Sequence, residues 1–338
     1  MITEKLIINA ENYEKSINRS AEILKQGGIV AIPTETVYGL AASALDENAI
    51  KKVFEAKGRP QDNPLIVHIS SMDMLNEVAC NIPKTALRCA QIFWPGPFTM
   101  VLPRTDKTAP CVSAGLDTVA VRMPSHKTAL DIIKAARLPL AAPSANVSGS
   151  PSPTTAIHVE NDLNGKIDAI VFDKECNVGV ESTVVSFCCN PPRLLRPGAV
   201  TVEQLKEIIP DLEIDKAILN QLEKGARVGS PGMKYKHYAP KTECFLVEGE
   251  DFAGFVNDKE NCVAVCFGEE SEEITVPKII YGKAADENTL AHEVFAVLRK
   301  VDDLGCEEVF IHAPSRDGIG LAVYNRLLRA CSFRVIEI

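Results

Sequence analysis

The sequence predicts an α/β or α+β protein of two domains, a large twisted mixed sheet followed by a small Rossmann-like α/β layer. Its 338 residues exceed what a single core usually organises. Short apolar runs that suit buried strands alternate with segments of helical periodicity. This alternation pauses near residue 210, where a Gly-, Pro-, Lys- and Tyr-rich stretch intervenes, and it restarts at Glu243. We therefore expect domains over 1–209 and 243–338, joined by a linker over 210–242.

The first domain is expected to contain seven or eight strands interleaved with helices. Its first helix, over residues 11–26, is indicated by apolar residues at helical spacing and ends at Gly27-Gly28. Asp46 is a suitable N-cap for a second helix that runs through Ala56. Further helices are expected over 72–79, 84–92, 127–137, 155–163 and 202–209. The expected strands lie in IVAIP, PLIVHIS, WPGPFTMVLP, TVAVRMP, PLAAPSAN, DAIVFD, STVVSF and PRLLRPG.

The linker and the second domain differ in pattern. A helical piece is expected over 214–225, before the run VGSPGMKYKHYAPKT. Beyond it, strands are expected in CFLVEG, NCVAVCFG, EEVFIHAP and FRVIEI, with helices over 291–304 and in GLAVYNRLLRAC, an order that fits a Rossmann-like layer. Gly318-Ile319-Gly320 lacks a third glycine at the right place, so it is weak evidence for a nucleotide site.

Composition and charge narrow the class of protein. The hydrophobic fraction of 46% and charged fraction of 24% are those of a globular protein. The net charge is −9, but residues 1–200 balance 20 basic against 20 acidic side chains, and the remainder carries 16 against 25. This distribution argues against broad coating by nucleic acid and leaves room for a local basic pocket in the first domain.

The cysteines and the apolar runs indicate a compartment. Eleven cysteines occur without a Cys-x-x-Cys pair, mostly among apolar neighbours, so we expect a reducing cytoplasm with no zinc site and no disulfide framework. The first sixteen residues lack the pattern of a signal peptide, and no apolar run approaches the roughly 20 residues of a membrane span.

Two cations stand out in the stretch from Pro33 to His68. Lys57 and Arg59 flank Gly58, and in an extended chain their side chains would point the same way. Gly58 would let a ligand approach the backbone. The pair would then place two fixed charges on one polyanion; the alternative is two solvated surface charges before a turn.

Other polar residues follow expected strands. Ser144, Asn146 and Ser152 lie where a strand gives way to a loop, and hydroxyls, an amide and free backbone N–H groups there suit phosphate or carboxylate oxygens. The alternative is a simple Ser/Gly-rich turn. Arg122 has apolar neighbours, and a buried arginine needs an anion, either a structural carboxylate or a bound ligand. His68 ends an apolar strand and has an alternative structural role.

These candidates share a kind of chemistry. The sequence contains no Walker A motif, kinase signature, Gly-x-Ser-x-Gly elbow or metal-ligand cluster. Cations and neutral polar groups without a strong nucleophile fit catalysis by positioning and charge stabilisation, as in phosphoryl or nucleotidyl transfer. The set comprises Thr34, Thr36, Lys57, Arg59, Arg122, Ser144, Asn146, Ser152, Ser182 and Arg196.

The motifs resemble a known family. Lys57-x-Arg59 followed far downstream by Ser144-x-Asn146 resembles the signature of the YrdC-like family of threonylcarbamoyl-AMP synthases. PTETVYGL, KGRP, NPLIVH, FWPGPFT, VAVRMP, PSAN, ESTVV and RPG resemble family segments in family order. The linker motif SPGMKYKHYAP and the α/β domain after it resemble the long, two-domain form.

The resemblance implies a reaction. L-threonine, bicarbonate or carbon dioxide, and ATP would give L-threonylcarbamoyl-adenylate and pyrophosphate. A downstream threonylcarbamoyl transferase would use the product to modify adenosine beside the tRNA anticodon, and a weak tRNA contact is expected. Mg²⁺ would accompany ATP without a dedicated cage of protein ligands.

The resemblance also implies roles for individual residues. Lys57 and Arg59 would be catalytic. L-threonine would contact Thr36, His68, Arg122 and Ser182. ATP would contact Arg59, Asn63, Thr118, Ser144, Asn146, Ser152, Arg196 and Tyr235.

Three alternatives stay open at this point. A double-stranded RNA-binding module is weakened by the neutral first domain and the acidic second one. A carbamoyl-adenylating enzyme of hydrogenase maturation would carry zinc-finger Cys pairs and an acylphosphatase domain, and neither is visible in the sequence. Finally, residues 230–240 either fold over the pocket as a lid, with Tyr235 on the nucleotide, or only space the domains.

Overall fold

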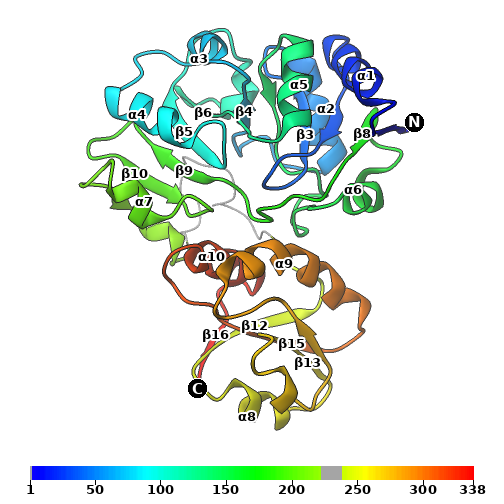
Figure 1. The fold of residues 1–338 in the computed structure, drawn as a ribbon, viewed down its shortest axis with the longest axis vertical. Coiled ribbons are helices and arrows are strands. Elements are labelled where there is room, and N and C mark those ends of the chain that lie inside the picture. Colours follow the sequence, from blue (N-terminus) through cyan, green and yellow to red (C-terminus); the bar gives the residue numbers. More distant parts are fainter. Residues whose placement is uncertain (1, 222–237) are drawn as a thin grey trace.

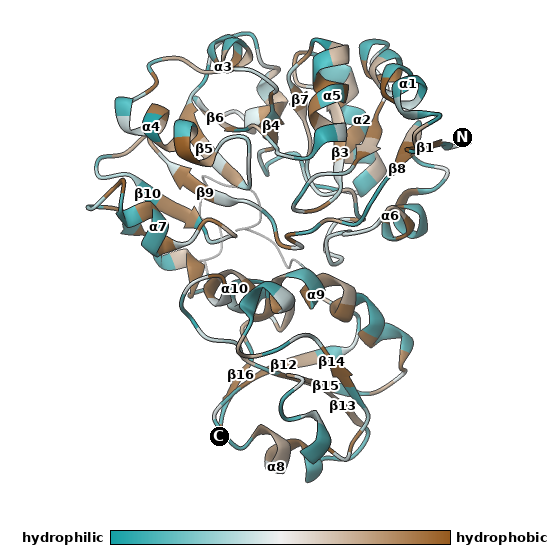
Figure 2. Cartoon of the chain, viewed as in Figure 1, coloured by the Kyte–Doolittle hydropathy of each residue, from teal (hydrophilic) through white to brown (hydrophobic). Residues whose placement is uncertain are grey.

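The computed structural model describes residues 2–221 and 238–338. It contains a larger body built on a mixed sheet and a smaller body built on a parallel sheet, and the smaller body presents helices α9 and α10 to the larger one (Figure 1). In both bodies apolar residues occur on the strands and on the helices, and the helices also carry many polar residues (Figure 2). The predicted fold class is therefore confirmed.

The larger sheet has eleven strands in the described residues, in the order β1-β8-β2-β3-β7-β4-β6-β5-β9-β10-β11. Parallel and antiparallel pairs alternate irregularly along it; β4 pairs parallel with β6, for example, and antiparallel with β7. All eight strands expected in the first domain are present. The bounds are β1 Glu4–Ile7, β2 Val30–Ile32, β3 Gly39–Ser43, β4 Ile66–His68, β5 Phe98–Pro103, β6 Thr118–Arg122, β7 Leu140–Ala141, β8 Ala169–Phe172, β9 Thr183–Ser186, β10 Arg193–Arg196 and β11 Glu213–Ile214.

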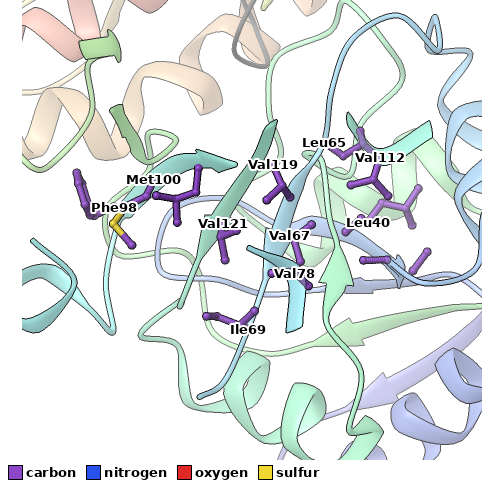
Figure 3. Packing of buried hydrophobic residues seen from close by; sticks show 14 of the residues in the cluster. Leu40, Leu65, Val67, Ile69, Val78, Phe98, Met100, Val112, Val119 and Val121 are labelled. Carbon is purple, nitrogen blue, oxygen red and sulfur yellow. The ribbon is translucent and has the colours of Figure 1, made fainter. Parts of the chain in front are cut away.

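Helices cover the larger sheet and bury its central strands. Side chains such as Leu40, Val67 and Val121, from three neighbouring parts of the sheet, meet in one apolar cluster (Figure 3). Asp46 caps α2 as expected, since its carboxylate accepts hydrogen bonds from the N–H groups of Asn48 and Ala49. The helices are α1 Tyr13–Lys25, α2 Glu47–Lys57, α3 Met72–Val78, α4 Lys84–Phe93, α5 Lys127–Ala136, α6 Ala156–Leu163 and α7 Val202–Lys206, with a 3-10 turn at Pro110–Ser113.

The helix expected over 214–225 is wrong in its described part. Glu213 and Ile214 instead form β11, which pairs in parallel with β10 at the edge of the larger sheet. A single 3-10 turn, Lys216–Ile218, follows, and the Asp215 carboxylate caps it by accepting from the Ala217 N–H. The larger sheet thus continues past residue 209, where we expected the linker to begin.

The smaller body is a parallel sheet in the order β14-β13-β15-β12-β16. The glycines that we considered as a weak nucleotide motif begin α10, where the Gly320 N–H donates to the Glu287 carboxylate (2.8 Å) and Ser315 Oγ donates to the same group (2.7 Å). A side chain of the protein therefore occupies that helix N-terminus. The elements are β12 Glu243–Glu248, α8 Phe252–Asn257, β13 Cys262–Cys266, β14 Lys278–Ile280, α9 Glu287–Lys300, β15 Glu308–His312, α10 Gly320–Ala330 and β16 Val335–Glu337, with 3-10 turns at Ser271–Glu273 and Val301–Asp303.

The two bodies pack closely. The Arg299 guanidinium on α9 forms two hydrogen bonds to the Asp162 carboxylate, of 3.1 and 2.8 Å. Gly179, with φ +82°, lies directly against the backbone of α9, so that a Cβ atom there would be 2.4 Å from the Ala291 carbonyl oxygen. No helix in the described ranges is long and apolar enough to cross a membrane.

Gly179→Ala tests this packing. We expect it to lower the free energy of unfolding by about 2–4 kcal/mol, since the left-handed backbone strain adds to the displacement of α9. Gly115→Ala is the matched control, because Gly115 has a similar φ of +77° and no atom within 4 Å of its Cβ position. Urea unfolding should show a loss of only about 1 kcal/mol for the control. Equal losses in the two variants would contradict close packing at Gly179.

Candidate active site

One pocket gathers most of the candidate residues on the larger body. Its empty space, counted together with the part that opens to solvent, is about 740 Å³. The end of α2, the end of β4, the loop after β7 and the segment before β9 all reach it. The expected residues that line it are Thr34, Thr36, Lys57, Arg59, His68, Arg122, Ser144, Asn146, Ser182 and Arg196.

Three expected residues lie elsewhere, and a fourth is outside the described residues. Asn63 is buried beside the lining residue Pro64, and Ser152 is buried behind the pocket wall. Thr118 opens β6, whereas the pocket residue Arg122 closes it, roughly 13 Å further along the strand at ~3.3 Å per residue. Tyr235 lies outside the described residues, as does most of the segment expected to act as a lid.

Lys57 holds the loop after β7. We expected Lys57 to lie in an extended segment, but it is the last residue of the helix α2, and its side chain is buried. Its Nζ donates to the carbonyl oxygens of Ser144 (2.5 Å) and Asn146 (2.6 Å). Burial lowers the pKa of Lys57 well below its usual value, and the neighbouring Arg59 cation acts in the same direction. The Lys57 side chain therefore fixes the pocket wall.

The backbone conformation at Gly58 favours glycine. It is the C-cap of α2 with φ +60°, and a Cβ there would meet nothing within 4 Å, so the requirement is for a left-handed conformation. The turn leaves Arg59 half-buried in the pocket lining, where its Nη2 donates to the Pro64 carbonyl oxygen (3.2 Å).

Arg122 has the structural carboxylate that was one of two expectations for it. Its Nη2 is 2.6 Å from Oε1 of Glu35, and both side chains are about 95% buried. Its Nη1 donates to Thr36 Oγ1 (2.8 Å), and its Nε donates to the Gly96 carbonyl oxygen (3.1 Å). Burial alone would raise the pKa of Glu35, but the Arg122 guanidinium outweighs burial and the pKa is lowered. The buried pair fixes Thr36 in the pocket wall.

His68 presents a neutral imidazole. It lies opposite Arg122 in the parallel pair of β4 and β6. Burial lowers its pKa to about 3, and the Arg122 cation acts in the same direction. Its Nδ1 is buried and has no hydrogen-bond partner within residues 2–221 and 238–338. A buried polar atom without a partner is uncommon, so His68 suits a ligand better than a purely structural role.

Ser182 and Arg196 form a second polar wall. Arg196 donates through Nε to the Ser182 carbonyl oxygen (3.0 Å) and through Nη2 to Ser182 Oγ (3.1 Å). Ser182 Oγ also lies 2.7 Å from Thr99 Oγ1. Burial lowers the pKa of Arg196 to about 10, which leaves the guanidinium charged at neutral pH.

Sequence reasoning assigned no role to two lining residues with ionisable side chains, Glu181 and Tyr238. Glu181 accepts a hydrogen bond from Ser152 Oγ (2.6 Å), so Ser152 acts on the pocket through this carboxylate. Tyr238 is buried, with φ +62°. Both lie in segments that resemble the family, ESTVV and KYKHYAP. In these segments we assigned binding roles to the neighbouring residues Ser182 and Tyr235 instead.

The Ser144–Asn146 loop is rigid by its own hydrogen bonds. Ser144 Oγ donates to Asn146 Oδ1 (2.5 Å), and Asn146 Nδ2 donates to the carbonyl oxygens of Val147 and Ser150, both at 2.8 Å. These hydrogen bonds are those of a Ser/Gly-rich turn, which was the alternative for this stretch. Ser144 and Asn146 nevertheless both line the pocket.

The described residues do not fit a protein cage for Mg²⁺. Within them no group of three or more His, Cys, Asp or Glu side chains lies close enough to hold a metal ion. Glu181 is the carboxylate of the described pocket lining, and it is already hydrogen-bonded to Ser152 and to Arg326.

Both bodies match families of known proteins. Residues 22–198 match a family profile described as "Telomere recombination", and residues 200–332 match one described as "Threonylcarbamoyl-AMP synthase, C-terminal domain". The chain is 43% identical to the threonylcarbamoyl-AMP synthase of Pyrococcus abyssi, over 98% of this chain and 99% of that protein. It is 41% identical to that of Bacillus subtilis, over 99% and 97%.

A solved structure matches over the full length. The crystal structure of P. abyssi Sua5 complexed with L-threonine superposes with a TM-score of 0.91 at 40% identity, covering 100% of both chains. E. coli YciO matches 60% of this chain with a TM-score of 0.54 at 20% identity, which is a likeness of fold alone.

The neutral His68 predicts a pH-dependent contribution to stability. Its folded pKa lies below the unfolded value of 6.5, so between about pH 6.5 and 3 the unfolded chain binds more protons and stability falls as pH falls. From pH 7.5 to pH 5, the wild type should lose about 2 kcal/mol more unfolding free energy than His68→Asn. Urea titrations of both proteins at both pH values measure this difference. Parallel losses would show that His68 titrates normally in the folded protein.

Proposed function

The chain belongs to the threonylcarbamoyl-AMP synthase family, and we propose that its pocket makes L-threonylcarbamoyl-adenylate and pyrophosphate from L-threonine, bicarbonate or carbon dioxide, and ATP. Family membership makes it an enzyme of the nucleotidyltransferase type. The observation that carries the proposal is the convergence of Lys57, Arg59, Ser144 and Asn146, from two distant motifs, on one pocket of a chain that aligns end to end with these enzymes.

The chemistry matches the charges of the pocket. The threonine amine captures carbon dioxide, and a carbamate oxygen attacks the α-phosphorus of ATP as the bond to pyrophosphate breaks. Negative charge builds on the α-phosphate and the leaving group, where Arg59 and Arg196 supply fixed cations. Lys57 acts less directly, because its ammonium group is hydrogen-bonded to the loop that carries Ser144. The enzyme's contribution is therefore mainly orientation and electrostatic stabilisation.

L-threonine would occupy the side of the pocket formed by Thr36, His68, Arg122 and Ser182. The relative from P. abyssi was crystallised with L-threonine, which supports an amino-acid subsite in this fold. Arg122 offers a cation and His68 a neutral imidazole, groups that suit an amino-acid carboxylate and a hydroxyl respectively.

ATP would occupy the side formed by Arg59, Ser144, Asn146 and Arg196. Asn63 and Ser152 would support that side from behind the wall, while the position of Thr118 at the far end of β6 argues against a direct contact. Mg²⁺ would enter on the ATP phosphates, since the described residues provide no cage for it.

The product would serve the modification of adenosine beside the tRNA anticodon that the family resemblance implies, through a separate transferase in the cytoplasm. Eleven free cysteines support a reducing compartment. The match of residues 200–332 to the C-terminal domain of threonylcarbamoyl-AMP synthases favours threonine over the hydrogenase-maturation alternative. The net charge of −9 gives little support to a double-stranded RNA-binding module, and tRNA contact stays a proposal.

The activity itself is the first test. We expect pyrophosphate release from ATP to require L-threonine and bicarbonate together, and mass spectrometry with labelled bicarbonate should find the label in the adenylate. Omitting either co-substrate is the control. ATP cleavage that proceeds equally well without threonine would sink the proposal.

Arg59→Ala tests the fixed cation. We expect a loss of roughly 2–4 kcal/mol of transition-state stabilisation in kcat/KM, by analogy with removal of a preorganised donor. Arg193→Ala is the control, because Arg193 is an exposed arginine on β10 that pairs with Glu213. Steady-state kinetics on folded protein decides, and near-wild-type turnover in Arg59→Ala would remove Arg59 from the mechanism.

A further inference from the structure

We propose that Arg326, on α10 of the smaller body, is a positioning residue for the ATP side of the pocket, because it neutralises Glu181 and holds the turn that follows Arg196. This inference rests on the proposed function. Arg326 does not line the pocket; its side chain is fully buried between the two bodies.

The contacts of Arg326 converge on two pocket segments. Its Nε donates to Glu181 Oε2 (2.7 Å), and its Nη2 donates to the Glu181 carbonyl oxygen (3.3 Å). Its Nη1 donates to the carbonyl oxygen of Pro197 (2.9 Å). The residues beside these two, Ser182 and Arg196, are the pair that hydrogen-bond to each other in the pocket wall. One guanidinium therefore joins the start of β9 to the end of β10.

The segment before β9 and the segment after β10 are in direct backbone contact. A Cβ atom at Gly198 would lie 2.4 Å from the Thr183 nitrogen and 2.7 Å from the Glu181 carbonyl oxygen. The spacing between the segments is thus set by direct backbone contact and by Arg326. A shift of either one would move Ser182 or Arg196 relative to the rest of the pocket.

The charge of Glu181 explains why a cation is needed there. A carboxylate in the lining of a pocket for phosphates repels them unless it is neutralised. Burial tends to raise the pKa of Glu181, but Arg326 and then Arg196 outweigh burial, and the pKa is lowered, so the group is ionised. Among the described residues, Arg196 is the next cation that acts on Glu181, and without Arg326 it would be drawn toward the carboxylate and away from substrate.

A second arginine of α10 provides a comparison. Arg329, one turn further on, is also buried, and its Nη2 donates to the Ala217 carbonyl oxygen (2.9 Å), which is not part of the pocket lining. Both arginines thus join the two bodies, but Arg326 hydrogen-bonds to the lining residue Glu181 and to Pro197, the neighbour of Arg196 on the ATP side. A purely structural role predicts similar effects of the two, whereas a positioning role separates them.

The experiment measures ATP binding by calorimetry and the KM values for ATP and threonine in Arg326→Met, in Arg329→Met and in the double variant Arg326→Met/Glu181→Gln. In Arg326→Met, we expect the Kd and KM for ATP to rise about tenfold, the size of one charge-assisted hydrogen bond. Arg329→Met should lower the thermal unfolding temperature and leave both ATP constants within about twofold. The double variant should recover most of the ATP affinity, because no unpaired carboxylate remains.

The outcomes separate the two proposals. If the wild type binds ATP and releases threonine-dependent pyrophosphate, but Arg326→Met behaves like Arg329→Met, the role of Arg326 is overturned and the proposed function stands. If the double variant is as impaired as Arg326→Met, neutralisation of Glu181 is overturned. Should Arg326→Met fail to fold, the double variant compared with Glu181→Gln alone gives the same test, and a further tenfold loss of ATP affinity there would contradict the proposal. A wild type that binds no ATP overturns both proposals.

Discussion

Each cation in the described pocket lining is held by a backbone carbonyl oxygen of a neighbouring loop. Lys57 binds that of Ser144, Arg59 that of Pro64, Arg122 that of Gly96 and Arg196 that of Ser182. Moving a cation out of water is costly, and carbonyl dipoles offset part of that cost. The same bonds fix the loops in space, so the charge of the pocket and its shape depend on one set of interactions.

The sequence was sufficient for most elements of the fold, because long apolar runs and good caps mark them. Asp46 and the run IVAIP are examples, and both were placed correctly. The strand β3, GLAAS, was not predicted because alanine and glycine have little preference for strands. Its place between β2 and β7 comes from tertiary packing. The helix expected from Ile214 is absent from the described residues for a related reason, since pairing with β10 overrode local helical periodicity and made this segment the edge strand β11.

Most residues of the candidate site were predicted from the sequence, but the hydrogen bonds and ion pairs that join them were not. Residue patterns supplied most of the candidate lining residues, and the resemblance to a family added their expected ligands. The extended geometry assumed for Lys57 and Arg59 was wrong because Gly58 ends a helix. The bonds that define the roles join residues far apart in sequence: Lys57 and Ser144 are 87 positions apart, and Glu181 and Arg326 are 145. No local pattern encodes such pairs, so the roles of Glu181 and Arg326 needed the structure.

The Glu287 carboxylate at the N-terminus of α10 has a consequence for nucleotide binding. In many parallel α/β folds this position receives a phosphate group, and here the chain supplies its own anion from α9. A nucleotide would have to displace a covalently tethered competitor whose local concentration does not fall on dilution. The smaller body therefore does not offer that helix end as a nucleotide site.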